Sequence, residues 1–156
     1  MRGASLIEAL LVMVLMAILV GLASTTIFNS QQRTSFSTAR DGIIRDMREQ
    51  QFRAMTGEIQ SAGVYVDYSV RFETTRYILY PGTVYTSGNS ANIVVTLDPI
   101  LQFSSIGFSG ATMTFARLSG DIRNFVQANS TVTLRNTQTN EQSIISFNMH
   151  GIPFIQ

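Results

Sequence analysis

Residues that could support catalysis or bind a metal ion are few and widely separated in this sequence. His150 is the only histidine, and a nucleophile that is activated by a base needs a partner held in a defined geometry. The acidic residues Asp67, Asp98 and Asp121 fall in different turn-forming segments, without an EF-hand spacing or a His/Cys cluster. A glycine-rich phosphate loop is also missing from the sequence. We therefore expect no catalytic residues, no metal site and no cofactor, and a protein that is not an enzyme.

The charge composition gives little preference for a class of ligand. All 11 basic residues are arginines and they face 10 acidic residues, so no strongly basic field favours nucleic acid as a general partner. Cysteine is absent, which excludes disulfides, thiolate metal sites and a lipid anchor on cysteine. A series of aromatic residues could offer a stacking surface for bases or sugars, but their alternation favours core packing. They are Tyr65, Tyr68, Phe72, Tyr77 and Tyr80.

One carboxylate is notable because of the segment that follows it. Glu8 precedes a run without charged residues that extends to Arg33, and residues 9–20 of this run are almost entirely aliphatic. At about 1.5 Å per residue, a helix over 6–23 covers the roughly 30 Å of a bilayer's hydrocarbon core. A carboxylate in the first turn of such a helix, two residues after Leu6, costs a few kcal/mol unless it has a partner or is solvated among lipid headgroups. The sequence therefore predicts a single membrane span with Glu8 near its start.

The order Arg2-Gly3-Ala4-Ser5-Leu6-Ile7-Glu8, followed by the aliphatic run, resembles the processing site of type IV prepilins. The resemblance implies that a short basic leader, residues 1–3, ends in Gly3, that prepilin peptidase cuts there, and that the mature chain begins at Ala4, where it is methylated. Glu8 is then fifth in the mature chain and is implied to function in assembly with other pilin subunits. An alanine at the mature start, and no proline late in the span, fit a minor pilin or pseudopilin better than a major pilin.

A second interpretation of the same segment is an ordinary secretory signal peptide. Arg2 would form its basic region, residues 9–20 its apolar region and 21–23 its cleavage site. The product would be a secreted or membrane-anchored β-rich binding module. Arginines after the span outnumber those before it, which by charge alone places the following domain in the cytoplasm. The resemblance implies the opposite, namely a single-pass protein of the cytoplasmic (inner) membrane with an extracytoplasmic C-terminal domain, assembled into a pilus or pseudopilus.

The segment after the span has helical periodicity and a charged face. Apolar residues at spacings of three, four and seven predict one buried face: Phe36, Ala39, Ile43, Met47 and Ala54, with Ile44 and Met55 beside them. Asp41, Arg45, Glu49 and Arg53 alternate in sign at a spacing of four, which predicts a series of stabilising ion pairs. Gly57 is the predicted end of the helix. We expect helix over 5–56, with 4–26 as membrane or filament-core helix and 27–57 as an amphipathic helix.

After Gly63 the period changes to two, which predicts a β-rich globular domain over 58–156. The expected strands are 64–66, 76–80, 93–97, 101–103, 112–115, 131–134 and 143–147, separated by turn-forming residues. The expected fold class is α+β and type IV pilin-like, in which the long N-terminal helix packs against antiparallel β-sheets that cover it.

The order of these elements is similar to that of the H-type minor pseudopilins of type II secretion and their FimT-like pilus relatives. This resemblance implies a subunit of a type IV pilus, a type II secretion pseudopilus or a DNA-uptake filament. It also makes DNA a possible ligand. The closing residues 150–156 contain no Arg or Lys, so only weak phosphate contacts through Arg117, Arg123 and Arg135 support DNA binding.

Overall fold

The computed structural model describes the backbone of residues 6–57 and 65–156, and the side chains of these ranges except those of 21–34. The chain divides into two compact units, Met1–Thr38 and Ala39–Gln156. Helix α1 (Leu6–Thr56) contributes to both. Its end is the one predicted, because Gly57 follows with φ +64°, a left-handed conformation that suits glycine at a helix C-terminus.

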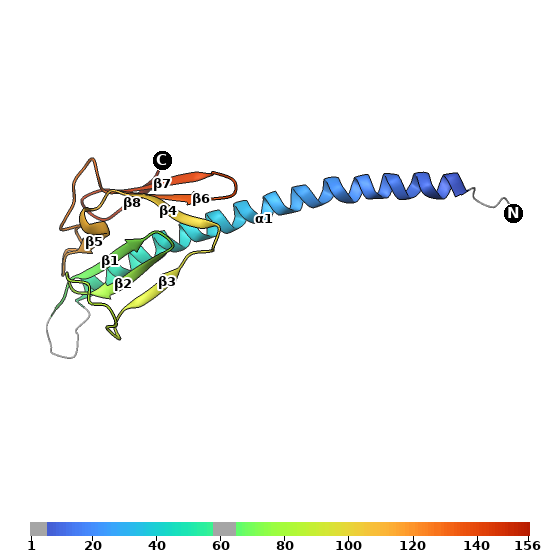
Figure 1. The fold of residues 1–156 in the computed structure, drawn as a ribbon. Coiled ribbons are helices and arrows are strands. Elements are labelled where there is room, and N and C mark those ends of the chain that lie inside the picture. Colours follow the sequence, from blue (N-terminus) through green and yellow to red (C-terminus); the bar gives the residue numbers. More distant parts are fainter. Residues whose placement is uncertain (1–5, 58–64) are drawn as a thin grey trace. The chain divides into compact units, whose positions relative to one another are not determined.

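The second unit is built mainly from two antiparallel sheets, which Figure 1 shows beside the C-terminal part of α1. The first sheet has the order β3-β2-β1-β5 and the second β4-β6-β7-β8. A short 3₁₀ turn, η1 (Ser109–Ala111), precedes β5. The strands are β1 (Tyr68–Glu73), β2 (Arg76–Pro81), β3 (Ile93–Thr96), β4 (Leu101–Ile106), β5 (Thr112–Phe115), β6 (Thr131–Asn136), β7 (Gln142–Phe147) and β8 (Pro153–Ile155).

Aromatic side chains join the two sheets. The ring of Phe72 on β1 meets that of Phe103 on β4 edge to face, with 5.4 Å between centroids, and Tyr77 on β2 approaches the same ring. Phe108 bridges further, stacking on Phe72 and contacting Phe147 of β7. Each of these five side chains is at least 95% buried, so the sheets bury one another's apolar faces.

Within this unit the last turns of α1 complete the core with one face. Ile43, Met47 and Ala54 are buried there, as their spacing predicted, whereas Met55 is 49% exposed. Two polar residues that the apolar pattern did not include, Asp46 and Gln50, are also buried on this face.

The expected fold class, an α+β type IV pilin-like arrangement of a long N-terminal helix packed on antiparallel sheets, is wrong. Helical residues with described side chains form two stretches, 6–20 (15 residues) and 35–56 (22 residues). The rest of the described chain is mostly β, with two sheets, and together with the end of α1 it forms the unit Ala39–Gln156, here called the body. In the described part of the chain, no helix has the length and apolarity that a membrane crossing requires. The physical reason is that the two sheets also pack on each other, through Phe72 and Phe103, so that only one face of the last turns of α1 completes the core.

Six of the seven expected strands are present, one was placed incorrectly, and two observed strands, β1 and β8, were not predicted. Residues 65 and 66 form no strand, and residue 64 lies outside the described part of the chain. The sequence interpretation also missed β1, although Tyr68, Val70 and Phe72 alternate with polar residues along it. This omission matters because β1 is a central strand, paired with both β2 and β5.

Candidate functional sites

The first candidate site is the start of α1, residues 6–20. Every large apolar side chain in this stretch is at least 50% exposed, and Leu6, Ile7 and Met13 are 75% exposed or more. The exposed side chains lie all around the helix, because they occupy consecutive positions. A helix that is apolar on every side is normally buried in lipid or protein. This stretch therefore needs a covering that one copy of the chain does not supply in its described residues.

Glu8 is the only charged residue in this stretch, and it lies exposed in the first turn of α1. A carboxylate at that position is favoured by the partial positive charge of the helix N-terminus. Gly3 and Ala4, the predicted processing residues, lie outside the described residues.

The charged face of α1 differs partly from the prediction. Arg53 and Glu49 form the expected pair, with 2.6 Å between nitrogen and oxygen. Arg45 instead contacts its neighbour Asp46 at 3.1 Å, and Asp41 contacts Arg40. Arg45 therefore adds positive charge beside a buried carboxylate, a contact that a spacing of four could not reveal.

Asp46 in turn accepts a hydrogen bond from the Tyr77 hydroxyl, with 2.5 Å between the oxygens. Burial and the adjacent carboxylate raise the pKa of Tyr77 well above its usual range near 10. The phenol is thus held in its protonated, hydrogen-bond-donating form. This contact joins α1 to β2 and is suited to stability rather than to proton transfer.

His150 lies in a solvent-exposed Asp–His pair. Its Nδ1 is 3.0 Å from Oδ1 of Asp121, and the Ser119 hydroxyl accepts the backbone N–H of Asp121. No hydrogen bond among the described residues joins Ser119 to the imidazole, so Ser119 is not positioned as a nucleophile that this histidine activates.

The three acidic turn residues are kept apart and have different local roles. Asp67 is buried and binds Arg123 at 2.7 Å while accepting the backbone N–H of Arg117. Asp98 accepts the N–H of Ile100 in a turn, and Asp121 pairs with His150. Among the described residues, no cluster of acidic, histidine or cysteine side chains could hold a metal ion.

The arginines predicted as phosphate contacts have protein partners. The guanidinium groups of Arg117 and Arg123 bind the carbonyl of Tyr65 and the carboxylate of Asp67, and Arg135 donates to Asn140. Of the aromatic series, Tyr65 is 45% exposed, whereas Tyr68, Phe72, Tyr77 and Tyr80 are buried. A stacking surface for bases or sugars is therefore not formed by these residues.

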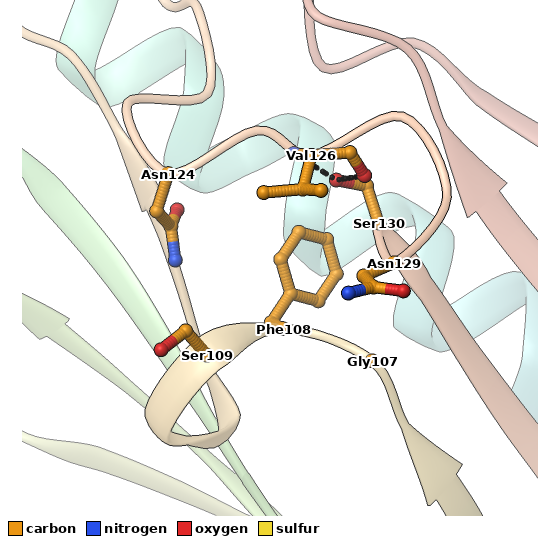
Figure 2. Close-up of a pocket in the computed structure, with 7 residues that line it drawn as sticks. All are labelled: Gly107, Phe108, Ser109, Asn124, Val126, Asn129 and Ser130. Atoms are coloured by element: carbon orange, nitrogen blue, oxygen red, sulfur yellow. Dashed lines mark hydrogen bonds between the residues drawn. The ribbon is translucent and has the colours of Figure 1, made fainter.

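A shallow cavity of about 130 Å³ lies between the loop after β4 and the loop before β6 (Figure 2). Figure 2 shows the ring of Phe108 between the two loops, facing Val126. Asn124 is committed to β5, because it donates to the Thr112 carbonyl and accepts from the Thr114 N–H. The lining residues include no titratable side chain: Gly107, Phe108, Ser109, Asn124, Val126, Asn129 and Ser130. The cavity therefore offers no group for acid–base chemistry.

Comparisons with protein-family models, with curated proteins and with solved structures give no significant match.

Proposed function

We propose that this chain is a type IV pilin-like subunit, a minor pilin or pseudopilin of the H type, which prepilin peptidase processes and which assembles with other pilin subunits. The proposed assembly is a type IV pilus, a type II secretion pseudopilus or a DNA-uptake filament. Delivery would be through the cytoplasmic membrane, with the C-terminal domain outside. The proposed role is structural rather than catalytic.

The observation that carries the proposal is the exposed apolar stretch of α1 together with its single charge. Burying apolar area contributes about 25 cal/mol per Å², so twelve exposed large side chains between Leu6 and Val20 give a strong drive for association. Equivalent stretches of neighbouring copies would cover one another in an assembled filament, and lipid would cover them before assembly. The two compact units fit a subunit that associates through its first segment, because the β-rich unit Ala39–Gln156 buries its own core.

Glu8 supplies the proposed specificity of assembly. Its carboxylate would pair with the α-amino group that cleavage after Gly3 frees on Ala4 of a neighbouring subunit. Opposite charges attract far more strongly beside hydrocarbon than in water, and each relieves the desolvation cost of the other. Processing and pairing are then parts of one mechanism, since cleavage creates the amine.

The experiment compares Glu8→Gln with the parent and with Glu141→Gln, which removes one carboxylate from an exposed position on the body. We expect Glu8→Gln to insert and to be processed normally, because loss of a charge eases insertion. Its incorporation into sheared filaments or cross-linked pseudopili should fall relative to the membrane pool, whereas Glu141→Gln should behave as the parent. Equal incorporation of all three forms would contradict the assigned role of Glu8.

A further inference from the structure

Each sheet has two edge strands; of the four described edges, β5 and β4 are bound by other segments and β8 is short and contains a proline. On β5, residues 121–124 occupy the outer side: the Thr114 carbonyl accepts the N–H of Arg123, and Asn124 bonds the Thr112 carbonyl. On β4, the outward N–H of Phe103 is bound by the carbonyl of Thr74. These contacts occupy outward backbone groups of both strands, so a further strand could not pair with these groups.

The β8 edge is protected in a different way. Its pairing with β7 directs Pro153 and Ile155 outward, since Phe154 and Gln156 are the residues that face β7. Pro153 has no N–H to donate, so this three-residue strand offers only one outward donor. Proline and short length are common devices against edge-to-edge pairing.

The β3 edge has none of these devices. Leu97 donates to the Thr75 carbonyl, which fixes the register with β2 and directs Val94 and Thr96 outward. No hydrogen bond between described residues uses the outward backbone groups of these two residues. Strand β3 contains no charged residue, proline or bulge, and all four of its side chains are β-branched. Two of these side chains are about half exposed, Ile93 at 46% and Val94 at 52%. Figure 1 shows β3 at the outer side of its sheet.

We propose that β3 pairs with β3 of a second copy of this chain, antiparallel about a two-fold axis at Val95. This register places Val94 of each copy opposite Thr96 of the other, so that the outward N–H and C=O groups of both residues form hydrogen bonds. An axis at Val94 would instead need Asn92, whose N–H is already bound to the Asn89 carbonyl. The observations therefore favour one register. This inference does not depend on the proposed function.

The electrostatics suit a second copy better than a charged peptide. Residues 93–97 contain no ionisable group, so like charges do not meet across the axis. The nearest charge, Asp98, would lie opposite Asn92 of the other copy rather than opposite a carboxylate. Because the other described edges are closed or shortened, β3 is also the best-matched strand that a second copy can offer. A four-residue pair is far smaller than the roughly 1,000 Å² of a stable interface, so we expect a weak dimer.

The test uses the absence of cysteine, so that one introduced thiol reports one contact. In the proposed register the two Val95 residues form a non-hydrogen-bonded pair with Cα atoms about 4.5 Å apart, which is within disulfide range. We expect full-length Val95→Cys in detergent to form a disulfide-linked dimer on mild oxidation. Gln127→Cys, at an exposed turn on the body, is the control for random collision and for association through the apolar helix.

A second variant keeps the proposal testable at the level of hydrogen bonds. Adding Val94→Pro to Val95→Cys removes two N–H donors of the dimer but none that β3 uses toward β2. We expect roughly tenfold slower cross-linking, with the cooperative thermal unfolding retained. Equal cross-linking of Gln127→Cys and Val95→Cys, or an unchanged rate with Val94→Pro, would overturn the proposal. A mixed disulfide with a different protein in cells, in place of the dimer, would also overturn it.

Discussion

Single residues in the body show how polar groups are accommodated in an apolar interior. Asp46 and Gln50 occupy the buried face of α1, a position where apolar residues are normally expected. Asp46 is stabilised there by the Tyr77 hydroxyl and by Arg45. Removing the Tyr77 hydroxyl would leave the buried Asp46 carboxylate with one hydrogen-bond donor fewer. The resulting loss of folding stability is larger than the net contribution of an ordinary hydrogen bond.

At the residue scale we predict that Tyr77→Phe destabilises the body by about 1–3 kcal/mol. The pKa of Tyr77 is raised on folding, so the folded state holds its proton where the unfolded state, with a pKa near 10, releases it. The stabilisation is fully present below about pH 10 and is lost as the pH rises above it. Thermal unfolding from pH 8 to 11, followed by circular dichroism, should show a smaller alkaline loss in Tyr77→Phe. Parallel pH curves for the two proteins would contradict this account.

At the scale of elements, two glycines have opposite surroundings. A Cβ on Gly42, inside α1, would meet no atom within 4 Å, whereas a Cβ on Gly107, after β4, would lie 2.1 Å from the Asn129 carbonyl oxygen. Gly42→Ala should therefore stabilise the protein by about 0.5–1 kcal/mol, because alanine restricts the unfolded chain. Gly107→Ala should destabilise it by about 1–3 kcal/mol through overpacking. Melting temperatures that shift in the same direction in both variants would be inconsistent with this packing.

Element periodicity predicted much of the fold but not how the elements pair. The helix end at Gly57 and the strands around Tyr77, Thr112 and Ser143 follow from local pattern and turn residues. The pattern could not reveal that Phe72 and Phe103 would meet across two sheets, because alternation identifies a buried face without identifying its partner. That missing information is why the expected long helix packed on sheets was wrong.

The candidate sites were predictable to different degrees. The residue types around Glu8 pointed to the apolar stretch directly. The open edge at β3 had no sequence signal, because it stands out only once the hydrogen bonds on β5 and β4 and the short, proline-containing β8 are known. The buried Asp46–Tyr77 contact was likewise hidden, since the two residues are 31 positions apart.

At the scale of the whole molecule, the two compact units differ in what surrounds them. The unit Ala39–Gln156 has its own core, formed by two sheets and one helical face, and its described arginines largely face protein partners. The described start of α1 has exposed apolar side chains and one carboxylate. The proposed role, a folded domain held in an assembly through its first segment, rests on this difference between the two units.

The most direct test of this proposed role is the intact mass of the mature chain purified from both membrane and secreted fractions, compared with that of a Gly3→Leu variant. We predict a parent chain that begins at Ala4, with or without a methyl group, and a variant that keeps its leader because a bulky residue blocks the peptidase. A parent chain that begins at Ser24 would indicate an ordinary signal peptide. That result, or the same mature mass in both proteins, would contradict the proposal of a processed pilin-like subunit.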